Sequence, residues 1–132
     1  MIYTLDTSTC VTFLRGKQPR FRQRVLSYFR DIAITAVVAA ELYYGAEHSA
    51  HPVSNHDQVD AFLAPFPMLP FDKAAAIAYG RIRADLARRG QLIGPNDLLI
   101  AAVALAMAST VVTHNTGEFA RVPGLLVEDW HS

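Results

Sequence analysis

The chain has 132 residues, of which 52% are hydrophobic and 18% charged, which is enough apolar material for one folded domain and excludes a disordered or fibrous protein. The 12 basic and 12 acidic residues cancel, so nucleic-acid binding would depend on local charge. A single cysteine, Cys10, excludes an internal disulfide and suits a reducing compartment. With no signal sequence and no apolar run of about 18 residues, we expect a cytoplasmic protein.

Short apolar runs alternate along the chain with stretches of helical periodicity. The apolar runs predict strands at residues 1–6, 31–35, 66–69, 110–113 and 125–128. The third run carries Pro67, which a strand tolerates at an edge or at its start. Cap residues and apolar spacing predict helices at residues 9–15, 19–29, 36–50, 57–63, 73–89 and 95–106. This order indicates an α/β fold, a mainly parallel sheet of about five strands flanked by helices, in a single domain over residues 1–132.

One carboxylate stands at the head of an otherwise apolar helix. Gly94 and Pro95 are residue types that begin helices, so Asp97 falls in the first turn, where backbone N–H groups favour an anion. The residues that follow, 98–106, have no polar face, which places this helix inside the protein. We therefore expect Asp97 at a rim between the core and solvent.

Other polar residues follow the predicted strands. Asp6 ends the first strand, Asn115 comes just after the fourth, and Glu41 lies about six residues after the second. In open α/β sheets ligands bind outside the carboxyl ends of the strands, so these residues are site candidates. This rule does not place Asp97 at that edge of the sheet. Two predicted helices separate the third and fourth strands, and one must lie across the sheet for Asp97 to reach the rim.

Each acid also has a purely structural interpretation. Asp6 can cap a helix, Asp97 can complement a helix dipole, and Glu41 can be a solvated helix residue. The joint pattern favours a shared role, because two carboxylates about 4 Å apart repel by roughly 4 kcal/mol at an effective dielectric constant near 20. A cluster therefore needs a proton or a cation between its charges. Oxygen ligands without cysteine or an organised histidine set favour Mg²⁺ or Mn²⁺.

Four sequence blocks resemble the PIN-domain ribonucleases, and within them the VapC toxins of bacterial toxin–antitoxin pairs. In order along the chain, these blocks are Tyr3–Ser8, Val37–Gly45, Gly94–Ala102 and Val112–Leu125. The resemblance implies a PIN-like domain in which Asp6, Glu41 and Asp97 are catalytic residues that hold Mg²⁺ or Mn²⁺. The fourth catalytic position of the family falls on Asn115, which is neutral here, so a second metal is in question and Glu118 is an alternative.

The resemblance also implies the activity and the partners. It predicts a metal-dependent endoribonuclease that hydrolyses RNA phosphodiester bonds, with transfer RNA or another structured RNA as substrate. It further predicts a homodimer, a cognate VapB-type antitoxin that inhibits the enzyme, contact with DNA only through that antitoxin, and no membrane association. Thr7, Ser8 and Thr113 are the expected hydrogen-bonding neighbours of the site. Basic residues in the first quarter of the chain are candidates for phosphate contacts.

Two other functions fit parts of the pattern. An aspartyl phosphotransferase of the haloacid dehalogenase type would use Asp6 as a covalent nucleophile, but it would normally carry a second aspartate where this chain has Ser8. A non-enzymatic module would use the acids to hold a structural ion or an arginine of a partner. His48, His51 and His56 lack the spacing of a zinc site, and we interpret them as loop residues.

Overall fold

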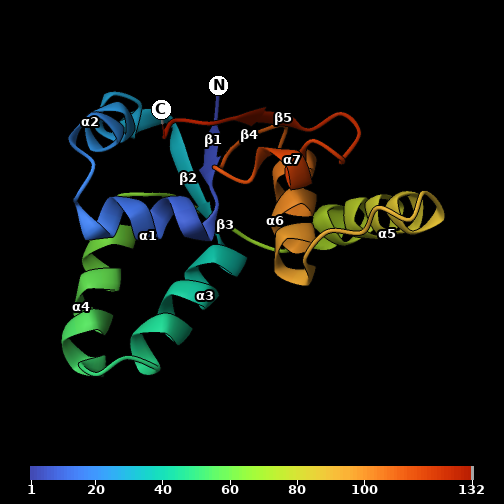
Figure 1. Ribbon diagram of the computed structural model, residues 1–132. Helices are drawn as coiled ribbons and strands as arrows, with labels where there is room; N and C mark the ends of the chain where they lie inside the picture. The colour runs from blue at the N-terminus through green and yellow to red at the C-terminus, as the bar shows by residue number, and fades with distance from the viewer. Residues whose placement is uncertain (132) are drawn as a thin grey trace.

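The computed structural model describes residues 1–131, in which five parallel strands form one sheet in the order β3-β2-β1-β4-β5 (Figure 1). The strands are β1 (Tyr3–Leu5), β2 (Ile32–Thr35), β3 (Met68–Leu69), β4 (Thr110–Val112) and β5 (Leu126–Glu128). The helices that flank them are α1 (Thr7–Arg15), α2 (Pro19–Ser27), α3 (Ala36–Glu47), α4 (Pro52–Leu63), α5 (Lys73–Arg88), α6 (Pro95–Ala106) and α7 (Thr116–Phe119). The predicted α/β class with a parallel sheet is confirmed.

The central strands are buried on both faces. Successive side chains of a strand point to opposite sides of the sheet, and in both β1 and β2 every residue is buried. Strands buried on both faces appear in the sequence as continuous apolar runs, and these runs predicted β1 and β2. Pro67 precedes β3, and β3 occupies one edge of the sheet, where a proline is tolerated.

Several element boundaries differ from the prediction, and α1 begins at Thr7, two residues earlier than expected. The helix expected at residues 19–29 ends at Ser27 and is followed by a 3₁₀ turn, Phe29–Asp31. The helix expected to reach residue 50 ends at Glu47. Helix α4 begins at Pro52, because proline suits the first helical position, so interpreting His56 as a loop residue was wrong. Helix α7 was not predicted.

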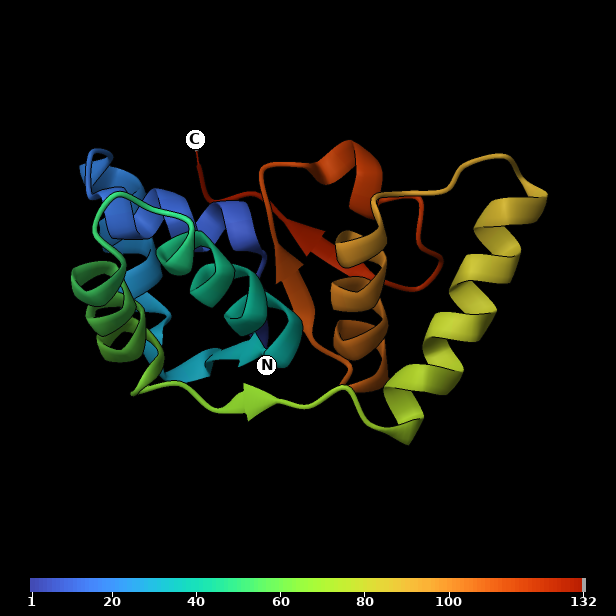
Figure 2. The same cartoon turned by 90° about the horizontal axis from the view of Figure 1, so that it is seen from below.

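Helices α5 and α6 explain how Asp97 reaches the rim of the sheet. They pack side by side and run in opposite directions, with α5 on the outer side of α6 (Figure 2). Helix α6 itself contacts β2 and β4. Only the start of α5 packs against the sheet, where Ala75 joins a buried cluster with Ala33 of β2 and Leu69 of β3. The rest of α5 lies outside α6, and the chain returns along α6 from the carboxyl edge towards β4.

The segment after β5 is anchored by an aromatic cluster. The Trp130 side chain is 1% exposed, and its ring lies 5.1 Å from that of Tyr3 and 4.9 Å from that of Tyr28, measured between centroids. Its indole N–H donates to Glu128. Trp130 thus packs against β1 and the α2–β2 connection. Within residues 1–131, no helix has both the length and the apolar character needed to cross a membrane.

Candidate active site

Asp6 is a buried carboxylate at the junction of β1 and α1. It is the N-cap of α1, where one carboxylate oxygen accepts a hydrogen bond of 2.9 Å from the Thr9 backbone N–H. The other oxygen accepts a hydrogen bond of 2.5 Å from the Thr113 hydroxyl, which lies just beyond β4. Asp6 is only 3% exposed, and its carboxylate is held by one partner from the first turn of α1 and one from the end of β4.

Glu41 is held by two other elements. One carboxylate oxygen accepts a hydrogen bond of 2.5 Å from the Thr7 hydroxyl at the start of α1. The other accepts one of 3.0 Å from the side-chain amide of Asn96, in the first turn of α6. Glu41 therefore has a fixed orientation although it is only half-buried on its own helix.

Asp97 lies in the first turn of α6 among other carboxylates. Burial, and then the negative charges of Glu118, Asp6 and Glu41, raise its pKa from 3.8 to about 6. Both carboxylates lie beside Gly94, where a Cβ atom would make ordinary contacts of 3.4 Å to a Glu118 oxygen and 3.6 Å to an Asp97 oxygen. Four acidic side chains thus interact within one small region.

Asn115 and Glu118 are joined to each other and to the head of α6. The Asn115 amide donates to one Glu118 oxygen, and the backbone N–H of Gly94 donates to the other. The Asn115 backbone N–H donates to the Thr113 hydroxyl at 2.8 Å. Glu118 therefore brings a negative charge to the place where Asn115 is neutral.

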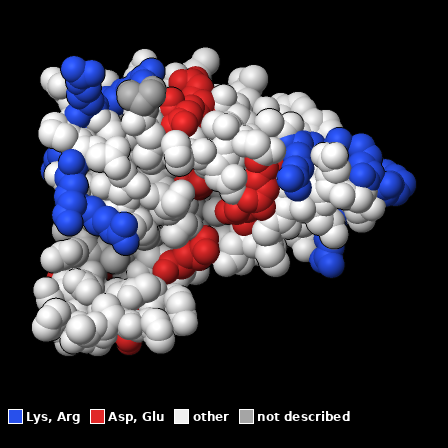
Figure 3. Space-filling view, in the orientation of Figure 1, with Lys and Arg blue, Asp and Glu red and all other residues white. Residues whose placement is uncertain are grey.

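These residues surround one cavity of about 510 Å³, lined by Asp6, Thr7, Ser8, Val11, Thr12, Arg15, Glu41, Asp97 and Asn115. All four residues predicted as catalytic from the sequence, at positions 6, 41, 97 and 115, are among its walls. Arg15 is the one cationic side chain in this lining. Figure 3 shows acidic groups in the middle of this face, with basic groups at its margins over α1, α2 and α5.

Comparison with known proteins agrees with this arrangement. The sequence matches the PIN domain family over residues 3–125. It is 40% identical over 128 residues, 97% of each chain, to the tRNA(fMet)-specific endonuclease VapC of Salmonella typhimurium. It is 38% identical over 132 residues, 98% of each chain, to Ribonuclease VapC2 of Rickettsia felis. The chain belongs to the VapC ribonucleases of the PIN-domain family.

Solved structures of VapC ribonucleases share the fold. DNA-bound VapBC from Salmonella typhimurium superposes with a TM-score of 0.94 at 39% identity, over 98% of each chain. VapBC2 from Rickettsia felis, bound to a DNA fragment from its promoter, gives 0.92 at 36% identity, over 98% of this chain and 99% of the other. Membership of this family identifies the chain as a nuclease, in preference to a phosphotransferase or a non-enzymatic module.

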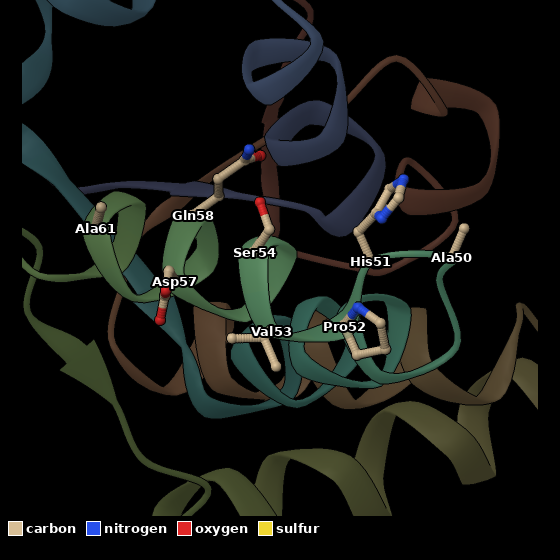
Figure 4. Close-up of a pocket in the computed structure, with 8 residues that line it drawn as sticks. All are labelled: Ala50, His51, Pro52, Val53, Ser54, Asp57, Gln58 and Ala61. Carbon is tan, nitrogen blue, oxygen red and sulfur yellow. The ribbon is translucent and has the colours of Figure 1, made fainter.

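A separate hollow of about 800 Å³ lies around the start of α4 (Figure 4). It is lined by exposed residues: Ala50, His51, Pro52, Val53, Ser54, Asp57, Gln58 and Ala61. These come from one loop and one helix and include a single carboxylate. The smaller acidic cavity, to which several elements contribute charged groups, is therefore the candidate active site of this VapC ribonuclease.

Sequence reasoning missed one cluster beside this site. His114, Asp129 and His131 approach one another at the ends of β4 and β5. The available signal was that Asp129 follows the fifth predicted strand directly, as Asp6 follows the first. The sequence did not show that the two histidines would meet there, because their contact depends on the pairing of β4 with β5.

The raised pKa of Asp97 predicts that the metal-free protein becomes more stable as the pH falls through about 6. The folded state then binds a proton that the unfolded chain, with a pKa of 3.8, does not bind until lower pH. Because Asp97 is half-exposed, we expect a gain of about 1 kcal/mol after allowance for solvent screening. Urea unfolding in EDTA should show this rise in the free energy of unfolding for wild type and not for Asp97→Asn. If the free energy of unfolding depends on pH in the same way in both proteins, the prediction is contradicted.

Proposed function

We propose that this VapC ribonuclease is a Mg²⁺- or Mn²⁺-dependent endoribonuclease toxin that hydrolyses phosphodiester bonds in transfer RNA or another structured RNA. The observation that carries the proposal is the convergence of Asp6, Glu41 and Asp97 on one cavity, where burial and the neighbouring carboxylates raise the pKa of Asp97 to about 6. Such repulsion is relieved by a bound cation. The name of the Salmonella relative supports transfer RNA as the substrate.

The donor set fits a hard divalent ion. Asp6, Glu41 and Asp97 offer carboxylate oxygens, and among residues 1–131 no thiol or imidazole lines the same cavity. We assign these three as the metal-binding residues and Asn115 as the fourth catalytic residue, with Glu118 supplying the additional negative charge beside it. A bound divalent ion lowers the pKa of a coordinated water and stabilises the charge that develops on the leaving oxygen.

The rest of the site holds these groups in place. Thr9 and Thr113 fix Asp6, while Thr7 and Asn96 fix Glu41, so the carboxylates do not need to be ordered when RNA binds. Arg15 in the cavity wall is placed to contact a phosphate of the substrate. Basic residues at both margins of the acidic region then offset the repulsion between RNA and the carboxylates (Figure 3).

A cognate antitoxin is the proposed regulator. The similar Salmonella and Rickettsia proteins were solved as VapBC complexes with DNA. These complexes support a VapB-type partner that inhibits this nuclease. They also support contact between the nuclease and DNA only through that partner. We also propose that this VapC ribonuclease forms a homodimer and is located in the cytoplasm.

The test is RNA cleavage by the full chain with and without a divalent ion. We expect discrete cuts with Mg²⁺ or Mn²⁺, none in EDTA, and recovery when the ion is returned. Glu41→Gln should reduce the rate by at least about 100-fold, because an amide replaces a charged ligand. Glu47→Gln, an exposed substitution at the end of the same helix, is the matched control and should cut normally. Cleavage that persists in EDTA, or in Glu41→Gln, would refute the proposal.

A further inference from the structure

Ligand-type side chains also gather at the carboxyl ends of β4 and β5. The Asp129 carboxylate lies between two imidazoles, with His114 Nδ1 at 3.1 Å from one oxygen and His131 Nδ1 at 3.0 Å from the other. The three residues each offer one ligand atom, and these atoms all lie within 4.8 Å of one another. None of the three lines the acidic cavity.

Packing fixes one side of this cluster and leaves the other open. The His131 side chain is 11% exposed, and its ring stacks on Phe21 with centroids 4.5 Å apart. The His131 backbone N–H donates to Asp129 at 2.9 Å, which orients the carboxylate. The His114 side chain, in contrast, is 73% exposed. An ion can therefore enter from solvent, and rotation of His114 can complete its coordination.

We propose that His114, Asp129 and His131 form a second metal site, which binds a divalent transition metal of the zinc class. Two imidazole nitrogens and one carboxylate are a common ligand set for such ions. With metal–ligand bonds of about 2.0–2.1 Å, tetrahedral ligand atoms lie roughly 3.3 Å apart. The separations of 3.1 and 3.0 Å, which run from the two imidazoles to different Asp129 oxygens, are close to this value, and all three ligand atoms lie within 4.8 Å of one another, so a small side-chain movement brings them around one ion. A solvent molecule takes the remaining position.

The ion would join two segments that are distant in sequence. His114 precedes Asn115 in the wall of the acidic cavity, whereas Asp129 and His131 belong to the segment anchored by Trp130. Metal binding would therefore fasten the loop between β4 and α7 to the end of the chain. This role does not depend on the proposed nuclease chemistry.

Zinc titration by calorimetry, with Mg²⁺ in excess to occupy the carboxylate cavity, tests the site on the full chain. We expect one Zn²⁺ ion to bind, with an affinity reduced by about 10- to 100-fold or more in His114→Asn and in His131→Gln. Because His114 is exposed, its variant should keep the fold. His56→Gln is the matched control: His56 also lies near carboxylates, Asp57 and Asp60, but without a second imidazole, and this variant should bind normally.

Two further measurements locate the ion. Zinc binding should persist in Asp97→Asn, and Co²⁺ should give visible absorption bands in wild type that are lost in His114→Asn. The proposal is overturned if no Zn²⁺ binds, or if both histidine variants bind Zn²⁺ as tightly as wild type does. It is also overturned if binding is lost in Asp97→Asn or His56→Gln. The last two results would place the ion in the acidic cavity or on α4.

Discussion

Asp97→Asn is expected to reduce the rate of RNA cleavage by at least about 100-fold while the protein remains folded. Asparagine suits the first turn of a helix, so α6 should still begin at Pro95. The variant removes the Asp97 charge, which Glu118, Asp6 and Glu41 repel, so the metal-free protein at pH 8 should be at least as stable as wild type. Cleavage assays and thermal melts measure the two effects.

The effect of the metal separates this result from a general loss of structure. Mg²⁺ should raise the melting temperature of wild type and should have a smaller effect on Asp97→Asn, because a ligand stabilises only the state that binds it. Asp57→Asn, on the exposed side of α4, is the control and should behave as wild type. If Asp97→Asn unfolds while its remaining folded fraction cleaves normally, Asp97 serves only the helix dipole.

Trp130→Ala should cost about 3–5 kcal/mol of unfolding free energy, because it empties a fully buried aromatic position. The lost contacts include the rings of Tyr3 on β1 and Tyr28 beyond α2. For a chain of this size, the melting temperature should fall by roughly 10–20 °C. Urea unfolding monitored by circular dichroism measures the free energy of unfolding, and a thermal scan measures the melting temperature.

Trp130→Phe is the matched substitution for this position. It keeps an aromatic ring against Tyr3 and Tyr28 but loses the N–H that donates to Glu128, so its cost should be clearly smaller. A loss below about 1 kcal/mol in Trp130→Ala would mean that the segment after β5 detaches without disturbing β1.

The sequence predicted the parts of the fold that depend on local pattern. The two central strands are buried on both faces, so their apolar runs were clear, and Asp6 and Asn115 were placed by the rule that sites lie at carboxyl ends. The helix start placed Asp97 at a rim between core and solvent, but only the family resemblance placed it at the same sheet edge as Asp6, because periodicity carries no information about the direction in which α5 runs. Helix α7 spans four residues, too few for a periodic signal.

The hydrogen bond from Thr113 to Asp6 joins residues 107 positions apart and closes one wall of the acidic cavity. In a chain emerging from the ribosome, Asp6 appears long before Thr113, so this hydrogen bond cannot form until β4 has been made. The candidate active site is therefore completed only when β4 pairs with β1. A chain interrupted before β4 also lacks Asn115, so the acidic cavity is open on that side until both segments are present.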